Sequence, residues 1–301
     1  MKYLIIGTGG VGGCIGAYLS KAGKDTTLIA RNANLKAMKE NGLIIEDVCG
    51  KQEKISVQAM ELKEYQEKAD VIFVCVKGYS LPVLMDDIKR VSDSHTVIIP
   101  ILNVYGTGDK MQEELDATVC DGCIYIASEV KEPGVILKKG DIFRIVYGLS
   151  NHKITPELEQ IKKDLEQSGI EAVLSTNIQR EAFKKYAYIS PAVTCGLYYH
   201  ATAGDMQKEG KVRDLFKTLI HEIELLASAM DISFEEDMVK ENVAILDTLA
   251  PISSTSMQRD IAQGKPSEID GLIYEVGRLA DKYHVELPTY QKIISQLQRF
   301  C

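Results

Sequence analysis

The first residues that could do chemistry form a glycine pattern near the amino terminus. Gly7, Gly9 and Gly12 follow a short apolar run, Lys2–Ile6, and precede a segment with apolar residues at helical spacing. In a strand–turn–helix unit, the first glycine permits a tight turn, the second lets the backbone approach a pyrophosphate, and the third allows close helix packing. The free N–H groups of the helix then bind phosphate. The segment Gly7-Thr8-Gly9-Gly10-Val11-Gly12 therefore predicts a dinucleotide site, against the alternative of a glycine-rich turn without a ligand.

Arg31 bears on which dinucleotide is bound. Sites that prefer NAD usually place an acid about 20 residues after the glycines, at the end of the second strand. Here the second predicted strand, Asp25–Ala30, is followed by Arg31. A guanidinium at this place can form paired hydrogen bonds with a 2′-phosphate. We therefore predict NADP(H) rather than NAD(H); the alternative is that Arg31 is a solvated surface charge.

The elements that must position these residues alternate between strands and helices. Val71–Val76 and Thr96–Pro100 are apolar strand patterns, and Leu81–Val91 between them has helical spacing. Shorter strand patterns, of which the first two could form a hairpin, occur at Leu43–Val48, Lys54–Val57, Ile124–Ile126, Gly134–Leu137 and Phe143–Tyr147. Such alternation predicts an α/β fold with a mostly parallel sheet covered on both faces.

The pattern changes after Ser175, where helical spacing dominates. Arg213–Met230 is amphipathic, and Ile269–Tyr283 is a second clear helical pattern. We therefore predict a Rossmann-type, NADP-binding domain over residues 1–175. An all-helical substrate and catalytic domain is expected over residues 176–301.

Composition excludes several functional classes. The net charge of −8 over 301 residues argues against a general nucleic-acid binder. No apolar run approaches the ~20 residues of a membrane span, and Met1–Ile6 lacks the features of a signal peptide, so we expect a cytoplasmic protein. Cys120 and Cys123 form one C-x-x-C pair among seven cysteines. Without a second pair or histidines at ligand spacing no metal site is expected, and a redox role is the less favoured alternative.

Further along the chain, separated motifs match one known family in order. The whole chain resembles the ketopantoate reductases, also called 2-dehydropantoate 2-reductases. The matching segments are Gly7–Gly12, Arg31, Val76-Lys77, Asn103 within Leu102–Gly106, Lys185, Ser256-Met257 and Glu268-Ile269-Asp270. The resemblance implies a Rossmann domain followed by a helical domain. It also implies NADPH-dependent reduction of ketopantoate to pantoate, in pantothenate and coenzyme A biosynthesis.

The resemblance assigns roles to five residues. Lys185 matches the catalytic lysine, which acts as general acid when hydride reaches the carbonyl carbon and a proton reaches its oxygen. Glu268 is implied to contact the cofactor and to help position Lys185. Asn103 is implied to lie near both nicotinamide and substrate, Ser256 to contact substrate, and Lys77 to contact the cofactor ribose or phosphate. By residue type alone, a helix lysine is usually a solvated charge and Glu268 a helix-capping acid.

Local patterns place two of these residues at helix starts. Ser267 is a good N-cap after the Gly264-Lys265-Pro266 break, which puts Glu268 in a first helical turn, where the helix dipole stabilises a carboxylate. Thr255 and Gln258 have capping-box spacing, so Ser256 should open another helix.

The sequence departs from the family in its substrate residues. Well-studied members carry asparagines where this chain has Ile189, Val193 and Ala203. Each lost hydrogen bond would weaken binding of a polar hydroxy-oxo acid by ~1 kcal/mol. Either Ser190, Thr194 or His200 replaces these donors, or the substrate is a more apolar 2-oxo acid.

Two functional classes remain open at this stage. The first is an NADPH-dependent reductase whose partner is a small 2-oxo acid, with ketopantoate favoured. The second is a non-catalytic NADP(H)-binding sensor or scaffold, which the missing asparagines motivate and the retained Lys185, Ser256 and Glu268 argue against. The sequence leaves the choice between a monomer and a homodimer open.

Overall fold

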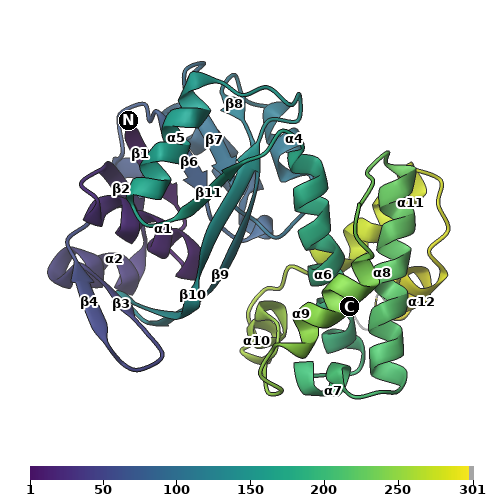
Figure 1. Ribbon diagram of the computed structural model, residues 1–301. Helices are drawn as coiled ribbons and strands as arrows, with labels where there is room; N and C mark the ends of the chain where they lie inside the picture. Colours follow the sequence, from purple (N-terminus) through teal and green to yellow (C-terminus); the bar gives the residue numbers. More distant parts are fainter. Residues whose placement is uncertain (298–301) are drawn as a thin grey trace. The chain divides into compact units, whose positions relative to one another are not determined.

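The computed structural model describes residues 1–297, which form two compact units (Figure 1). The first unit comprises Met1–Leu102 and Gly106–Glu181. The second comprises Asn103–Tyr105 and the chain from Ala182 onward. A three-residue segment that follows a strand of the first unit thus packs with the helices of the second.

A six-stranded parallel sheet forms the centre of the first unit. Its strands are β1 (Lys2–Ile6), β2 (Asp25–Ile29), β5 (Gln58–Met60), β6 (Val71–Val74), β7 (Val97–Pro100) and β8 (Thr118–Val119). They lie in the order β5-β2-β1-β6-β7-β8, and every neighbouring pair is parallel. The predicted parallel α/β fold is confirmed. Since β1 pairs with β2 on one side and β6 on the other, the strand order reverses between β1 and β6.

Burial on both faces explains the unbroken apolar strands. Along β1, Tyr3 and Ile5 join one core cluster, while Leu4 and Ile6 join another. All four side chains are at most 1% exposed. Successive side chains of a strand point to opposite faces, so a sheet covered on both sides requires continuous hydrophobic runs.

Five α-helices belong to the first unit, and one differs from its prediction. They are α1 (Gly10–Lys21), α2 (Asn32–Asn41), α3 (Met85–Val91), α4 (Thr107–Gln112) and α5 (Pro156–Gln167). The segment 81–91 was predicted to be one helix. It begins as a 3-10 turn, Pro82–Leu84, and becomes α-helical only at Met85. Pro82 has no N–H and fits only the start of a helix.

A second, mixed sheet contains the shorter predicted strands. Its members are β3 (Leu43–Glu46), β4 (Gln52–Ile55), β9 (Asp121–Glu132), β10 (Val135–Gly148) and β11 (Glu171–Leu174). The predicted β3–β4 hairpin is confirmed as an antiparallel pair. The three strands predicted between residues 124 and 147 are parts of one long hairpin of β9 and β10 (Figure 1). The sequence pattern breaks because residues 139–142 of β10 are exposed and carry no apolar alternation.

Helices dominate the second unit, as predicted. They are α6 (Ile178–Tyr198), α7 (Ala203–Gln207), α8 (Lys211–Ala229), α9 (Met238–Asp247), α10 (Ser256–Ala262), α11 (Glu275–Lys282) and α12 (Pro288–Leu297). The amphipathic pattern at 213–230 is α8, which buries Leu219, Ile223 and Leu226. The helical pattern at 269–283 is also present, but its first half is a π-helical segment, η4 (Asp270–Tyr274).

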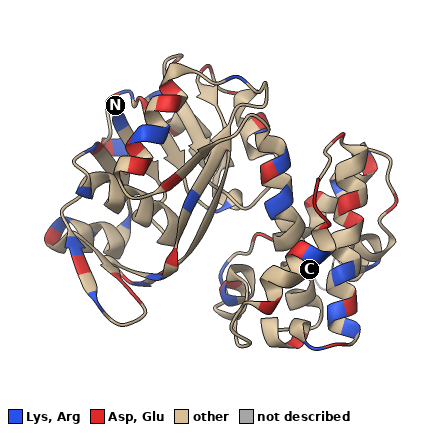
Figure 2. Ribbon diagram, in the orientation of Figure 1, with Lys and Arg blue, Asp and Glu red and all other residues tan. Residues whose placement is uncertain are grey.

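Charged residues are distributed over both units. Figure 2 shows acidic and basic residues interspersed along the helices, while most of the strands are uncharged. Among residues 1–297, no helix has both the length and the apolar composition needed to cross a membrane.

Candidate functional site

The glycine loop after β1 has the backbone conformation that the sequence predicts. Gly7 has φ +98°, a left-handed conformation that a residue with a side chain rarely adopts. A Cβ on Gly12 would lie 2.2 Å from the carbonyl oxygen of Gly7, so α1 packs directly on the loop. A Cβ on Gly9 would meet nothing within 4 Å. Of the three glycines, Gly9 therefore borders open space, which is where a ligand could approach the backbone.

The amino terminus of α1 is suited to an anion. The helix begins at Gly10, its first turn contains no acid, and Gly13 N donates to Gly9 O at 2.9 Å. The N–H groups before Gly13 therefore lack helical acceptors. A Cβ on Gly10 would lie 2.8 Å from the carbonyl carbon of Ser128, so strand β9 covers one side of this turn. Val11 instead packs against the core of the unit.

The side chains of Thr8 and Asn34 hold the glycine loop in place through hydrogen bonds. The Thr8 hydroxyl donates to Ile29 O at 3.1 Å, linking the loop to the end of β2. Asn34 Nδ2 donates to Thr8 O at 3.0 Å, and Asn34 Oδ1 accepts from Gly134 N at 2.9 Å. Asn34 thus joins the loop to the turn of the β9–β10 hairpin. Sequence reasoning missed Asn34, because no local pattern connects residues 34 and 134.

Arg31 and Lys77 both follow strands of the parallel sheet. Arg31 is exposed and has extended backbone (φ −139°) immediately before α2. Lys77 is half-buried, and its carbonyl accepts from Ser80 N at 2.8 Å. A Cβ on Gly7 would lie 2.8 Å from Val76 Cγ1, so the chain beyond β6 lies beside the glycine loop.

These features together fit a phosphorylated dinucleotide. In open α/β sheets, ligands bind at the carboxyl ends of the strands where the strand order reverses. The glycine loop follows β1 and Lys77 follows β6, the two strands that flank this reversal. The fit rests on the open space at Gly9, the acid-free helix amino terminus and the cation after β2.

In the second unit, Lys185 and Asn103 form a direct contact. Lys185 Nζ donates to Asn103 Oδ1 at 2.9 Å, across 82 residues of sequence. Lys185 lies on α6 and is half-buried, as is Asn103. The charge-assisted bond fixes the direction of the ammonium group. Two residues predicted separately for one site are therefore neighbours.

Glu268 is buried at the start of the helical segment that leads into η4. Only 6% of the residue is exposed. Its carbonyl accepts from Leu272 N at 3.0 Å, so Glu268 rather than Ser267 provides the first helical acceptor. The prediction that Ser267 caps this helix, with Glu268 in its first turn, is wrong by one residue.

Ser256 is the first residue of α10, as predicted. The capping box is confirmed: Gln258 N donates to Thr255 Oγ1 at 3.2 Å, and Thr255 N donates to Gln258 Oε1 at 2.9 Å. Gln258 Nε2 also donates to Gly196 O at 3.1 Å and to Ala201 O at 2.9 Å. The second set of bonds attaches α10, and with it the half-buried Ser256, to the end of α6.

The residues that replace the family asparagines differ in exposure. Ile189 is half-buried and lies one turn beyond Lys185 on the same face of α6. Val193 and Ala203 are 3% and 2% exposed. Of the three, Ile189 is the residue with surface available to a ligand.

The hydroxyls of Ser190 and Thr194, considered as replacements for the family asparagines, form hydrogen bonds within the protein. Ser190 and Thr194 are both fully buried. Ser190 Oγ donates to Leu272 O at 2.7 Å, and Thr194 Oγ1 donates to Ser190 O at 2.7 Å. These bonds argue against either residue replacing an asparagine as a substrate donor. His200 is exposed, with φ +53°, at the turn that follows α6.

A proline inside α6 is compensated by a side chain from α9. Pro191 has no N–H, so the carbonyl of Ala187, four residues earlier, loses its helical donor. Asn242 Nδ2 donates to Ala187 O at 3.3 Å, and Asn242 is 2% exposed. This contact supports the helix that carries Lys185.

The cysteine pair is poorly placed for redox chemistry. Cys120 is completely buried and Cys123 is 3% exposed. Burial raises the pKa of the Cys120 thiol, which disfavours the reactive thiolate. This burial favours the interpretation of the two cysteines as core residues.

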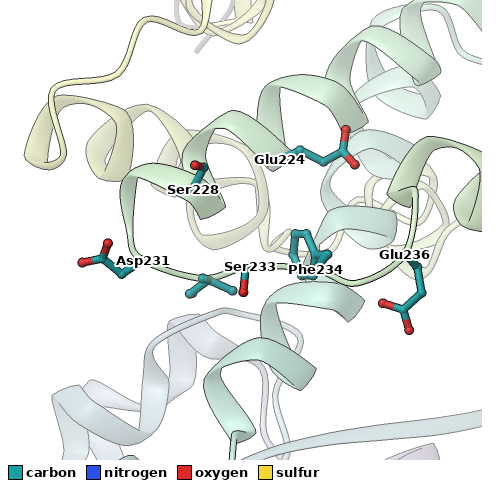
Figure 3. A pocket seen from close by; sticks show the side chains of 7 residues that line it. Glu224, Ser228, Asp231, Ser233, Phe234 and Glu236 are labelled. Atoms are coloured by element: carbon teal, nitrogen blue, oxygen red, sulfur yellow. The ribbon is translucent and has the colours of Figure 1, made fainter.

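A hollow of about 480 Å³ on the second unit is a poor match for the 2-oxo acid expected from the sequence. Figure 3 shows Glu224 and Ser228 on α8, with the other labelled residues on the loop after that helix. The lining residues are Glu224, Ser228, Asp231, Ile232, Ser233, Phe234 and Glu236. Three carboxylates repel an anionic 2-oxo acid, and none of the predicted site residues contributes to the hollow.

Comparison with known proteins identifies relatives along the full chain. The family model described as ketopantoate reductase PanE/ApbA matches residues 3–152, and the model of its C-terminal region matches residues 177–300. An uncharacterized oxidoreductase of Bacillus subtilis, YkpB, is 27% identical over 100% of this chain and 99% of its own length.

Solved structures share the fold. A PanE/ApbA family ketopantoate reductase from Ralstonia eutropha JMP134 has a TM-score of 0.89 and 22% identity, covering 99% of this chain and 97% of its own. A D-mandelate dehydrogenase, solved as a ternary structure with NADH and anilino(oxo)acetate, has a TM-score of 0.87 and 20% identity, covering 99% and 98%. At these identities the likeness establishes the architecture.

Proposed function

Because the chain belongs to the ketopantoate reductase PanE/ApbA family, we propose that it is an NADPH-dependent reductase of a small 2-oxo acid. Ketopantoate, reduced to pantoate, is the first candidate substrate. The observation that carries the proposal is the 2.9 Å bond between Lys185 Nζ and Asn103 Oδ1, because it brings a cationic donor and an amide together from distant parts of the sequence.

The proposed chemistry divides between the cofactor and Lys185. NADPH, when bound, supplies hydride to the carbonyl carbon. The Lys185 ammonium polarises the carbonyl and donates a proton to its oxygen. Asn103 orients that ammonium through its side-chain oxygen. Glu268, buried at the start of the helical segment that leads into η4, supports the same group of residues, and Ser256 offers a hydroxyl to the substrate carboxylate.

The first unit would hold the nucleotide. Gly7 and Gly12 shape the turn, and Gly9 leaves space for the pyrophosphate above the amino terminus of α1. We assign Thr8, Gly10 and Val11 to the same loop, Arg31 to the 2′-phosphate, and Lys77 to the ribose or phosphate. Arg31 supports NADPH over NADH because its guanidinium can pair with the additional phosphate.

A more apolar 2-oxo acid is the second candidate substrate. Ile189 presents an apolar surface one turn from Lys185. Ile189→Asn should therefore improve kcat/KM for ketopantoate relative to an apolar 2-oxo acid by about 5-fold, which corresponds to one net hydrogen bond of ~1 kcal/mol. Val193→Asn should instead destabilise the protein, because Val193 is 3% exposed and a polar side chain there lacks solvent.

The direct test is NADPH oxidation across a panel of 2-oxo acids that includes ketopantoate. Lys185→Ala should lower kcat/KM about 100- to 10,000-fold, the usual contribution of a general acid. Lys184→Ala is the matched control, because Lys184 is the adjacent lysine and pairs with Glu236 at 2.6 Å. Full activity of the Lys185→Ala protein would refute the mechanism. Binding of NADPH without turnover of any acid in the panel would instead favour the non-catalytic sensor.

A further inference from the structure

The contacts around Lys185 form a closed ring of residues within the second unit, made of Lys185, Asn103, Val104, Gly271 and Tyr186. Lys185 Nζ donates to Asn103 Oδ1, and the next residue, Val104, packs against Gly271. The Gly271 carbonyl in turn accepts from the hydroxyl of Tyr186 at 3.0 Å. Tyr186 directly follows Lys185, so the ring returns to its starting point.

One side of the ring is the π-helical segment η4 (Asp270–Tyr274). π-Helical turns are rare and occur frequently at functional sites. Here two successive carbonyls of the segment receive side-chain donors from α6. Tyr186 is 2% exposed and donates to Gly271 O, while Ser190 donates to Leu272 O at 2.7 Å. The helix that carries Lys185 and the segment that follows Glu268 are thus held together by buried hydrogen bonds.

The other side of the ring is the close contact between Gly271, which has no side chain, and the branched side chain of Val104. A Cβ on Gly271 would lie 2.5 and 2.8 Å from the two γ-carbons of Val104, and 3.2 Å from its Cβ. A side chain at position 271 would therefore force Val104, and with it Asn103, to move. Tyr105 anchors the same segment from the other end, since its ring meets that of Phe183 edge-on at 4.7 Å.

We propose that Gly271 and Tyr186 are positioning residues for the reaction, acting through Val104 to hold the Asn103 amide against the Lys185 ammonium. The inference rests on the proposed function of Lys185 as general acid. Asn103 follows a strand of the parallel sheet, and its neighbours Val104 and Tyr105 both pack within the second unit. The shape match at Gly271 is therefore what sets the place of the amide oxygen.

Gly271→Ala tests this proposal, and Val104→Ala in the same chain is its rescue. Gly271→Ala should lower kcat about 10- to 100-fold, because a misplacement of about 1 Å costs that much in a catalytic pair. The KM for NADPH should change less than kcat does, because the glycine loop, Arg31 and Lys77, which are assigned to the phosphates and ribose, lie in the other unit. The double variant Val104→Ala/Gly271→Ala removes the two γ-carbons and should recover kcat to within about 3-fold of the wild type.

A pH profile separates positioning from a general loss of structure. An ammonium that loses an acceptor is easier to deprotonate, so the alkaline limit of the kcat profile of Gly271→Ala should move to lower pH. Tyr186→Phe should move it in the same direction by a smaller amount. Gly277→Ala is the matched control for Gly271→Ala, because its Cβ would meet only a flexible Ile294 methyl at 3.0 Å. Tyr147→Phe is the matched control for Tyr186→Phe, because it removes a buried hydroxyl that donates to Leu158 O at 2.8 Å in the first unit.

A measurement without turnover keeps the inference independent of the substrate. The ¹³Cε resonance of Lys185, assigned by its loss in Lys185→Ala, should shift and titrate differently in Gly271→Ala and return in the double variant. If this resonance and kcat are unchanged in a folded Gly271→Ala protein, or if Val104→Ala gives no rescue, the ring does not position Lys185. Absence of turnover in the wild type, with the resonance responding as expected, would overturn the proposed function and leave the positioning contact intact.

Discussion

The hydrogen bond from Asn242 to α6 allows a quantitative prediction of how its loss changes the free energy of unfolding. Pro191 deprives the Ala187 carbonyl of its helical donor, and Asn242 Nδ2 supplies a replacement at 3.3 Å. Ala187 and Asn242 are 0% and 2% exposed, so water cannot take over the bond. Asn242→Leu removes the donor and retains a side chain of similar size.

The expected magnitude follows from the cost of a buried carbonyl without a donor, ~1–3 kcal/mol. Because leucine fills the same space, little additional cost from a cavity is expected. Pro191→Ala restores an N–H four residues after Ala187. In that background the backbone satisfies the carbonyl, and Asn242→Leu should cost less than about half as much. The coupling free energy between the two positions should therefore be roughly 1 kcal/mol.

Urea denaturation followed by tyrosine fluorescence is a suitable assay, since the chain has 14 tyrosines and no tryptophan. The wild type, both single variants and the double variant form a complete cycle. An equal cost of Asn242→Leu in both backgrounds would show that Asn242 does not compensate for Pro191. The reasoning about the helix that carries Lys185 would then be refuted.

Three further predictions concern the first unit. Gly9→Ala should leave the melting temperature nearly unchanged and weaken NADPH binding at least about 10-fold. Gly12→Ala should instead destabilise the fold, because its Cβ would lie 2.2 Å from a loop carbonyl oxygen. Thermal melts and NADPH fluorescence titrations separate the two outcomes. Arg31→Ala should raise the Kd for NADPH about 10- to 100-fold and that for NADH less than about 2-fold, and equal losses for both nucleotides would contradict the assignment. Burial, reinforced by a neighbouring aspartate and opposed by one backbone N–H, raises the pKa of Asp121 to about 6. Because this exceeds the unfolded value of ~3.9, the free energy of unfolding should rise as the pH falls from about 7 to 4, and Asp121→Asn should abolish this rise. If urea melts of the wild type and of Asp121→Asn gave the same pH dependence of the unfolding free energy, this role of Asp121 would be excluded.

Local patterns were sufficient for much of the first unit. The runs at β6 and β7, and that of β1 from Tyr3 onward, are apolar because both faces of the sheet are covered, and that signature needs no knowledge of distant residues. The capping box of Thr255 and Gln258 was equally readable, since both partners lie within one turn. The β9–β10 hairpin was only partly found, because its exposed middle, residues 139–142, carries no apolar alternation.

The amino-acid sequence by itself determined the parallel sheet, the glycine turn and the helical second unit, because each leaves a pattern of residue types that can be read within a short segment, even though paired strands such as β1 and β6 lie far apart in the chain. Only the tertiary structure decided that Asn103 reaches Lys185, that a π turn packs against α6, and that Ser190 and Thr194 are buried. Those features depend on which surfaces meet once helices pack. A hydroxyl or amide has the same local propensity whether it faces a ligand or a buried carbonyl, and burial alone distinguishes the two.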